Sequence, residues 1–307
     1  MVHLTPISLY RMHTFTLEVK YGVHWKEGVR DTPMQSSLGK EMHYTADRFG
    51  DTVFEQYERR RRISKGQVFA HEAREERDVV ALGHPEFEGL EIGQKRTVPM
   101  TAMFIDLRDF TGRSFWDPQD QVADLAHAIL AGFIETVLRH GGYPLGLRGD
   151  GLFAGFGPGD PRVGASFALA AGAFALNAID ENVNPRLEQR GIRPVQARAG
   201  LDFGDITFVR TGSPGHSEIN PVGFAANFAA KCEKQAKSWE IVTGENLANL
   251  FPGASQFTKV YPAKTYTRDH HTERYHFHDY RWRGTLTHSE SLTEELAGRP
   301  VSAVSIG

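Results

Sequence analysis

The segment Met100–Phe156 decides the fold, through Thr101-Ala-Met-Phe-Ile-Asp106 and Leu145-Gly-Leu-Arg-Gly149-Asp150-Gly-Leu-Phe-Ala-Gly-Phe156. Each is a short apolar run of the kind that forms a β-strand, and the second reads as a hairpin with its turn at Asp150. Between them, residues 118–140 carry apolar side chains at helical spacing, and His140-Gly-Gly142 marks the helix end. The segment is therefore predicted to form a strand, a helix and a hairpin.

The two aspartates in this segment predict a metal site. A right-handed crossover would place the first strand beside the hairpin, so that Asp106 and Asp150 meet at one sheet edge. Two neighbouring carboxylates repel each other unless a cation lies between them. Taken alone, Asp150 could equally be an ordinary turn residue, because Asp-Gly is common in hairpins.

The rest of the chain predicts an α+β fold. A helix is expected at 161–179, a strand at 195–203, a turn at Gly204-Asp205 and a strand at 206–209. A third helix (222–235), a short strand (239–242) and a helix (244–250) follow. This order predicts a ferredoxin-like βαββαβ core that is extended by a further hairpin, helix and strand.

The chain divides into three predicted parts. Residues 1–97 form an N-terminal accessory region packed on or extending the core, with a strand at 15–21 and a helix at 41–62. Residues 98–284 form the catalytic domain, and 285–307 a polar, flexible tail. The run Arg59–Arg62 is typical of a helix end, where cations are favoured by the helix dipole. A contact of this run with a partner, nucleotide or anion stays open as an alternative.

Composition points to a soluble, cytoplasmic protein. The chain has 307 residues, a formal charge of −3 and one cysteine, Cys232, which excludes an intrachain disulfide and a cysteine-based zinc site. The N-terminus lacks the basic-then-apolar layout of a signal peptide. The most apolar stretch, 163–179, is predicted to be a buried helix that is too short and too polar to span a bilayer. Neither nucleic acid nor a membrane is expected as a partner.

The motifs resemble those of the class III nucleotidyl cyclases over roughly residues 100–250. Phe104–Thr111 resembles the first metal motif of that family, and Gly141–Asp150 the second. Ala199–Ile206 resembles its Gly-Ile-His-Thr-Gly hairpin. Gly223–Lys231 resembles its Gly-x-x-x-Asn-x-x-x-Arg helix. Four motifs in the right order are a specific signal, although each one alone is weak.

The resemblance implies that a nucleoside triphosphate is converted to a 3′,5′-cyclic nucleotide and pyrophosphate. Attack of the ribose 3′-oxygen on the α-phosphorus needs two Mg²⁺ or Mn²⁺ ions. By resemblance, Asp106, Asp150 and the Leu107 carbonyl would bind them. The substrate would be contacted by the turn Leu107, Arg108, Asp109, Phe110 and Thr111, whose backbone N–H groups could hold phosphates.

The helix motif supplies two further residues. Asn227 and Lys231 are spaced i, i+4 and hence share one helix face. By resemblance, Asn227 orients the ribose and Lys231 replaces the arginine of the family. Lysine is a point charge without the fork of arginine, so either Lys231 acts more weakly or another cation, Arg148 or Arg108, contributes. A merely solvated helix face is the competing interpretation. In the family these residues and the aspartates come from different subunits, which implies a head-to-tail homodimer with active sites at the interface.

The base-reading positions depart from those of purine cyclases. Gly146 stands where the family has an adenine-reading lysine, and Asn220 stands where it has the partner aspartate. Asp109 replaces a usual glycine. The chain is therefore similar to the pyrimidine cyclases of bacterial anti-phage (Pycsar) signalling, with UTP to cUMP expected first and CTP to cCMP second. A separate cyclic-nucleotide-sensing effector, not contacted directly, would read the product. A purine cyclase with an atypical pocket, or an inactive nucleotide-binding dimer, are the alternatives.

A histidine-rich segment gives a weaker signal. His270, His271, His276 and His278 could indicate a transition-metal site, because alternate residues of a strand share one face. No carboxylate or cysteine cluster accompanies them. A basic edge strand near the triphosphate, carrying Lys264, Arg274 or Arg281, is the favoured interpretation.

Overall fold

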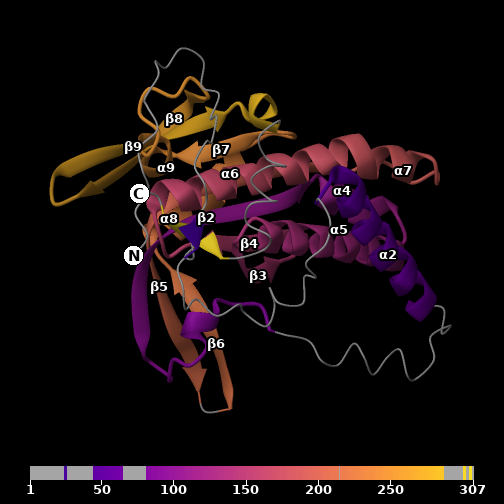
Figure 1. Cartoon of the computed structure of the whole chain (residues 1–307), viewed down its shortest axis with the longest axis horizontal. Coiled ribbons are helices and arrows are strands. Elements are labelled where there is room, and N and C mark those ends of the chain that lie inside the picture. Colours follow the sequence, from indigo (N-terminus) through magenta and orange to yellow (C-terminus); the bar gives the residue numbers. More distant parts are fainter. Residues whose placement is uncertain are drawn as a thin grey trace.

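The computed structural model describes residues 24–25, 44–64, 81–213, 215–286, 300–301 and 304–305. In these residues an eight-stranded sheet runs in the order β3-β4-β2-β5-β7-β9-β8, with β6 paired to β5. Helices lie against the sheet (Figure 1). The strand predicted at 15–21 lies outside the described residues.

The centre of the sheet is β2 (Lys95–Arg108), which pairs antiparallel with both β4 (Gly151–Phe156) and β5 (Gln196–Ser213). β3 (Tyr143–Arg148) completes a hairpin with β4. The connections are α4 (Phe110–Trp116) with α5 (Gln119–Arg139), and α6 (Pro161–Ala178) with α7 (Asn184–Glu188). The order β3-β4-β2-β5 is the ferredoxin-like arrangement of a βαββαβ unit, which confirms the predicted core.

The predicted extension of the core is also present. β6 (His216–Val222) leads into α8 (Phe224–Gln235), followed by β7 (Ile241–Gly244) and α9 (Glu245–Asn249). β7 runs parallel to β5 and antiparallel to β9 (His271–Tyr280), which pairs with the edge strand β8 (Phe257–Arg268).

The predicted turn at Gly204-Asp205 is wrong. β5 continues through both residues, which pair with Met100 and Pro99 of β2. The chain reverses only after Ser213, where β6 begins its pairing with β5. The fourteen residues of β2 pair with β5 from Gln196 to Val209. The backbone hydrogen bonds of this pairing outweigh the local turn preference of Gly-Asp.

Alternation along β2 assigns its two faces. Met103, Ile105 and Leu107 belong to the core cluster that holds the buried side chains of α5 and α6. Ala102 lies on the opposite face, in the cluster that includes Ala225, Ala226 and Ala229 of α8. Because side chains alternate along a strand, Asp106 shares the α8 face with Ala102.

Gly200 of β5 lets α8 approach this face closely. A Cβ at this position would lie 1.9 Å from the Glu233 backbone nitrogen and 2.4 Å from the Ala229 carbonyl oxygen. Any larger residue would therefore push the helix away from the sheet. The approach brings the end of α8 next to the end of β2 that carries Asp106.

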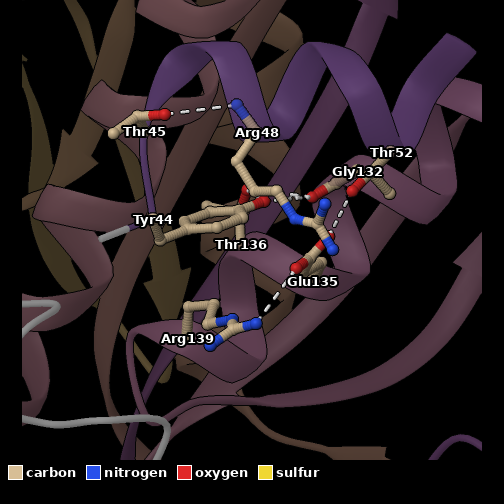
Figure 2. A network of polar contacts seen from close by, with 8 residues as sticks. All are labelled: Tyr44, Thr45, Arg48, Thr52, Gly132, Glu135, Thr136 and Arg139. Atoms are coloured by element: carbon tan, nitrogen blue, oxygen red, sulfur yellow. Dashed lines mark hydrogen bonds and ion pairs between the residues drawn. The ribbon is translucent and has the colours of Figure 1, made fainter. Parts of the chain in front are cut away.

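The N-terminal helix α2 (Ala46–Ser64) packs on α5 through apolar and polar contacts. The Tyr44 hydroxyl lies 3.0 Å from the Thr136 hydroxyl, which donates to the Gly132 carbonyl (Figure 2). Eight residues after Tyr44, the Thr52 hydroxyl donates to the Glu135 carboxylate at 2.6 Å. α2 is therefore joined to α5, the long helix between β2 and β3.

Two further contacts bear on the predicted parts of the chain. Arg61 forms an ion pair with Asp120 in the first turn of α5, at 3.1 Å, so this member of the arginine run has an internal partner. Val301, in the predicted polar tail, is fully buried and its N–H donates to the Gly141 carbonyl. This residue is not solvated, whereas the division into 1–97, 98–284 and 285–307 stays a prediction.

Two helical runs of the described chain are long and apolar enough to cross a bilayer by length and composition, α5 and Pro161–Glu188. The second run spans 28 residues, so length does not exclude a membrane span as the sequence suggested. Most residues of both runs are buried in the protein, which accounts for their apolar composition.

Candidate active site

The structure brings Asp106 and Asp150 to the same place. Asp106 is the last β2 residue that pairs with β4, and its partner is Gly151, the residue after Asp150. A Cβ at Gly151 would lie 2.9 Å from Asp106 Oδ1. This oxygen of Asp106 therefore faces the hairpin that carries Asp150.

The electrostatics of this corner favour a cation. The pKa of the Asp150 carboxyl is raised above its ordinary value, first by burial and then by the charge of Asp106. A divalent cation between the two carboxylates would remove this repulsion. The described residues contain no group of three His, Cys, Asp or Glu side chains arranged to hold a metal. Two aspartates plus a backbone carbonyl, the set expected from the sequence, need no third side chain, so the donors fit Mg²⁺ or Mn²⁺.

Two residues that the sequence did not single out complete this corner. Arg198, which is opposite Asp106 in β5, donates from Nη2 to Asp106 Oδ2 at 3.2 Å and forms an ion pair with Glu233 of α8. The pKa of Glu233 is raised to about 7 by burial first and by the nearby Asp106 charge, while Arg198 opposes that shift. Alternation along a strand predicts only that the Arg198 side chain lies on the other face of the sheet from Ala197 and Ala199. Its partners depend on strand register and helix placement.

The turn after Asp106 contains a residue with an unusual backbone conformation. Asp109 adopts a left-handed conformation with φ 56° at the start of α4. Glycine takes this conformation most easily, and Asp is among the few other residues that tolerate it. Asp109 therefore adopts a conformation that is also open to glycine, the residue expected here from the resemblance.

The side chains of the turn lie in different environments. Leu107 and Phe110 are buried, so only their backbone groups could contact a ligand. Thr111 and Asp109 are exposed and Arg108 is half-buried. Pairing of β2 with β4 ends at Asp106, whereas pairing with β5 continues to Arg108. From Leu107 onward, the side of β2 that faced β4 has no β4 partner for its backbone groups. Metal binding by the Leu107 carbonyl stays a prediction.

Asn227 and Lys231 lie on the outer face of α8. Asn227 is exposed and Lys231 half-buried, whereas Glu233 is buried against the sheet. Two residues correspond to about 200° around a helix, so Lys231 and Glu233 point in nearly opposite directions. The pair expected from the resemblance therefore faces away from the Asp106 of its own chain.

The predicted base-reading residues are far apart in one chain. Gly146 lies in β3, near the hairpin turn, and a Cβ there would be 3.3 Å from Arg148 Nη1. Asn220 lies in β6 opposite Val209, and Val209 pairs with Lys95 at the far end of β2 from Asp106. The eleven residue-to-residue steps from Lys95 to Asp106 span about 36 Å in a strand. One chain thus supplies only part of the expected nucleotide site.

The histidine segment has ordinary structural contacts. His276 Nδ1 is 3.0 Å from a Glu245 carboxylate oxygen, and His278 is buried. The described residues contain no group of three His, Cys, Asp or Glu side chains that could hold a metal. The suggested transition-metal site is therefore not formed by these histidines. The β8–β9 hairpin with Lys264 and Arg274 lies at the opposite edge of the sheet from β3.

The architecture is that of the class III nucleotidyl cyclases. The structure of the adenylyl cyclase CyaB from P. aeruginosa superposes with a TM-score of 0.53 and 19% identity, covering 61% of this chain and 95% of that one. At this identity the likeness establishes the fold.

Curated relatives add sequence similarity. A cytidylate cyclase of Escherichia coli is 25% identical over 189 residues, which are 57% of this chain and 41% of that protein. A cytidylate cyclase of Staphylococcus aureus is 26% identical over 184 residues, or 58% and 43%. The chain thus spans about two fifths of the length of these relatives. No protein-family profile matches the sequence. The predicted resemblance to class III nucleotidyl cyclases, the pyrimidine cyclases among them, is confirmed.

Proposed function

We propose that this protein is a metal-dependent nucleotidyl cyclase that converts a pyrimidine nucleoside triphosphate to its 3′,5′-cyclic monophosphate and pyrophosphate. The observation that carries the proposal is that Asp106 and the Asp150 hairpin lie at the same end of the neighbouring strands β2 and β4, where the charge of Asp106 helps to raise the pKa of the Asp150 carboxyl. The class III fold and the cytidylate cyclase relatives support the same reaction.

The reaction replaces one phosphorus–oxygen bond by another and releases a proton to water. The ribose 3′-oxygen bonds to the α-phosphorus, the 3′-hydroxyl proton is released, and the bond from the α-phosphorus to the pyrophosphate oxygen breaks. Two divalent cations held by Asp106, Asp150 and the Leu107 carbonyl would supply Lewis acidity to the 3′-oxygen and charge neutralisation to the triphosphate. The turn Leu107–Thr111 opens into α4, and its backbone N–H groups would bind the outer phosphates.

Gly146 and Arg148 support a pyrimidine as the base. At Gly146 no side chain projects where purine cyclases carry a base-reading lysine, and the Arg148 guanidinium lies beside this position. The guanidinium could donate to the acceptor atoms O2 and N3 of cytosine or to the carbonyl oxygens of uracil. The names of the relatives favour CTP, whereas the sequence analysis placed UTP first. Both remain candidates for the substrate.

The distribution of the site residues supports a homodimer. Asn227 and Lys231 face away from their own sheet, and Asn220 lies at the far end of β2 from Asp106. In a head-to-tail pair of chains, these residues would lie beside Asp106 and Asp150 of the partner subunit. We place this dimer in the cytoplasm, in keeping with the single, buried Cys232. By resemblance alone, we extend the proposal to a second messenger in anti-phage defence that a separate effector reads.

The decisive experiment incubates the purified protein with ATP, GTP, CTP or UTP in Mg²⁺ or Mn²⁺ and identifies products by mass spectrometry. Asp106→Asn is the test variant, because it keeps the side-chain size and removes the charge. Asp120→Asn is the matched control, since Asp120 lies on the surface of α5 and pairs with Arg61. We expect a cyclic pyrimidine nucleotide from the wild type and from Asp120→Asn, and none from Asp106→Asn.

Other outcomes would change the proposal. A cyclic purine would keep the reaction and overturn the base assignment. Product from Asp106→Asn at the wild-type rate would refute the metal assignment. No product from any triphosphate, together with nucleotide binding, would favour an inactive nucleotide-binding dimer. The level of cyclic nucleotide in the native host before and after phage infection tests the defence role.

A further inference from the structure

The Asp106 carboxylate is held by the side chain of Arg198, a residue that the sequence analysis did not single out. Its two carboxylate oxygens have different surroundings: Oδ1 faces Gly151 and the Asp150 hairpin, while Oδ2 accepts a hydrogen bond from Arg198 at 3.2 Å. The side chains of Asp106 and Arg198 are 21% and 12% exposed, so water does little to weaken their interaction. One oxygen of Asp106 is fixed, and the other is directed to the predicted metal position.

Arg198 is itself fixed from several sides. Its Nη1 donates to the Ala236 carbonyl at 3.3 Å and lies 3.5 Å from the Lys234 carbonyl oxygen, at the C-terminal end of α8. The Glu233 carboxylate, 10% exposed, forms an ion pair with the same guanidinium. A planar guanidinium can make these contacts together, whereas an ammonium group cannot.

Arg198 supplies the positive charge of this cluster. The Arg198 guanidinium lies beside Asp106, and the Glu233 carboxylate is paired with the same guanidinium. Without Glu233, the guanidinium would neutralise half of the charge that the two aspartates offer to a metal. Glu233 lies on the opposite side of α8 to Lys231, where it pairs with Arg198 and also contacts the Asp106 side chain, so it is placed to balance the charge of Arg198.

We infer that Arg198 and Glu233 are positioning residues for the metal ligand Asp106. Arg198 orients the carboxylate so that Oδ1 is presented to the cation, and Glu233 balances the Arg198 charge so that Asp106 keeps its attraction for metal. This inference rests on the proposed function, because it requires that Asp106 binds a divalent cation. Partners that orient a ligand in this way affect metal affinity by about 10- to 100-fold.

The test measures Mn²⁺ binding to the full chain without nucleotide, by electron paramagnetic resonance of the free ion. We expect Arg198→Gln and Glu233→Gln each to weaken Mn²⁺ binding by about 10- to 100-fold. Arg198→Lys should recover part of the loss, because an ammonium group can still donate one hydrogen bond to Asp106 Oδ2 but lacks the fork that makes the other contacts. Arg186→Gln is the matched control, since it removes an arginine–aspartate ion pair with Asp51 that lies on α2 and α7. Its Mn²⁺ affinity should equal that of the wild type.

Melting temperature is recorded for every variant, because a merely structural role would lower stability and leave Mn²⁺ affinity unchanged. If Arg198→Gln does not fold, Arg198→Lys and Glu233→Gln carry the test. Mn²⁺ affinities within threefold of wild type for these variants, with binding lost in Asp106→Asn, would overturn the inference and leave the proposed function intact. Binding that Asp106→Asn does not reduce would refute the metal assignment, and the inference with it.

Discussion

Asp202 should make the stability of the protein depend on pH. This residue lies in β5, is fully buried, and accepts hydrogen bonds from the Phe203 and Leu247 N–H groups and the Tyr275 hydroxyl. Burial is the largest influence on its carboxyl and raises its pKa from 3.8 to about 7, with the hydrogen bonds acting in the opposite direction. The folded protein therefore prefers the neutral carboxylic acid near pH 6.

The sign and size of the effect follow from this shift. A raised pKa in the folded state means that the folded protein holds the proton more tightly than the unfolded chain does. The stabilisation is complete below the unfolded pKa near 3.8, and it is lost as the pH rises through about 7. At about 1.4 kcal/mol per pKa unit, the total loss is roughly 4 kcal/mol, spread over that interval.

Asp202→Asn tests the effect with little change of shape. The amide oxygen can keep the bonds from Phe203 and Leu247, both of which go to Oδ1, and the amide nitrogen can face the Tyr275 hydroxyl. The measurement is urea unfolding of both proteins from pH 5 to pH 8. The free energy of unfolding of the variant minus that of the wild type should rise by up to about 1.4 kcal/mol per pH unit and level off above about pH 8.

Comparing the two proteins at each pH cancels the other titrating groups. The pKa values of His84 and His140 are both lowered to about 4 by burial, and these residues change stability in the same way in both proteins. A difference between variant and wild type that stays flat from pH 5 to pH 8 would refute the reasoning. It would mean that the hydrogen bonds to Asp202 keep it ionised in the folded state.

Two further predictions concern the active site. Gly151→Ala should lower cyclase activity at least tenfold with a small change in melting temperature, because its Cβ would lie 2.9 Å from Asp106 Oδ1 and turn the carboxylate away. Gly112→Ala, with no atom within 4 Å of its Cβ, is the control, and equal activity of both variants would contradict this view of Asp106. Mixing inactive Asp106→Ala and Asn227→Ala proteins should restore activity, since a mixed head-to-tail dimer has one site with both residues intact. Mixtures that exchange subunits and stay inactive would exclude a shared interface site.

The sequence alone determined much of the core. Helical spacing between Pro118 and His140, and the apolar runs on either side, predicted a strand, a helix and a hairpin close to where they occur. Chain handedness then placed Asp106 beside the Asp150 hairpin, which the pairing with Gly151 shows. These features are local, or follow from a rule that holds for nearly all such connections.

Only the tertiary structure decided the partners of these elements. Gly204-Asp205 has the local preference of a turn, but pairing with Pro99 and Met100 keeps it extended. Arg198 and Glu233 are 35 residues apart, and they meet because Gly200 lets α8 lie directly on β5. Register and close approach are set by backbone pairing and packing between distant segments. A single sequence shows which residues would allow such contacts. Which of the contacts form depends on how distant segments pair and pack in the folded chain.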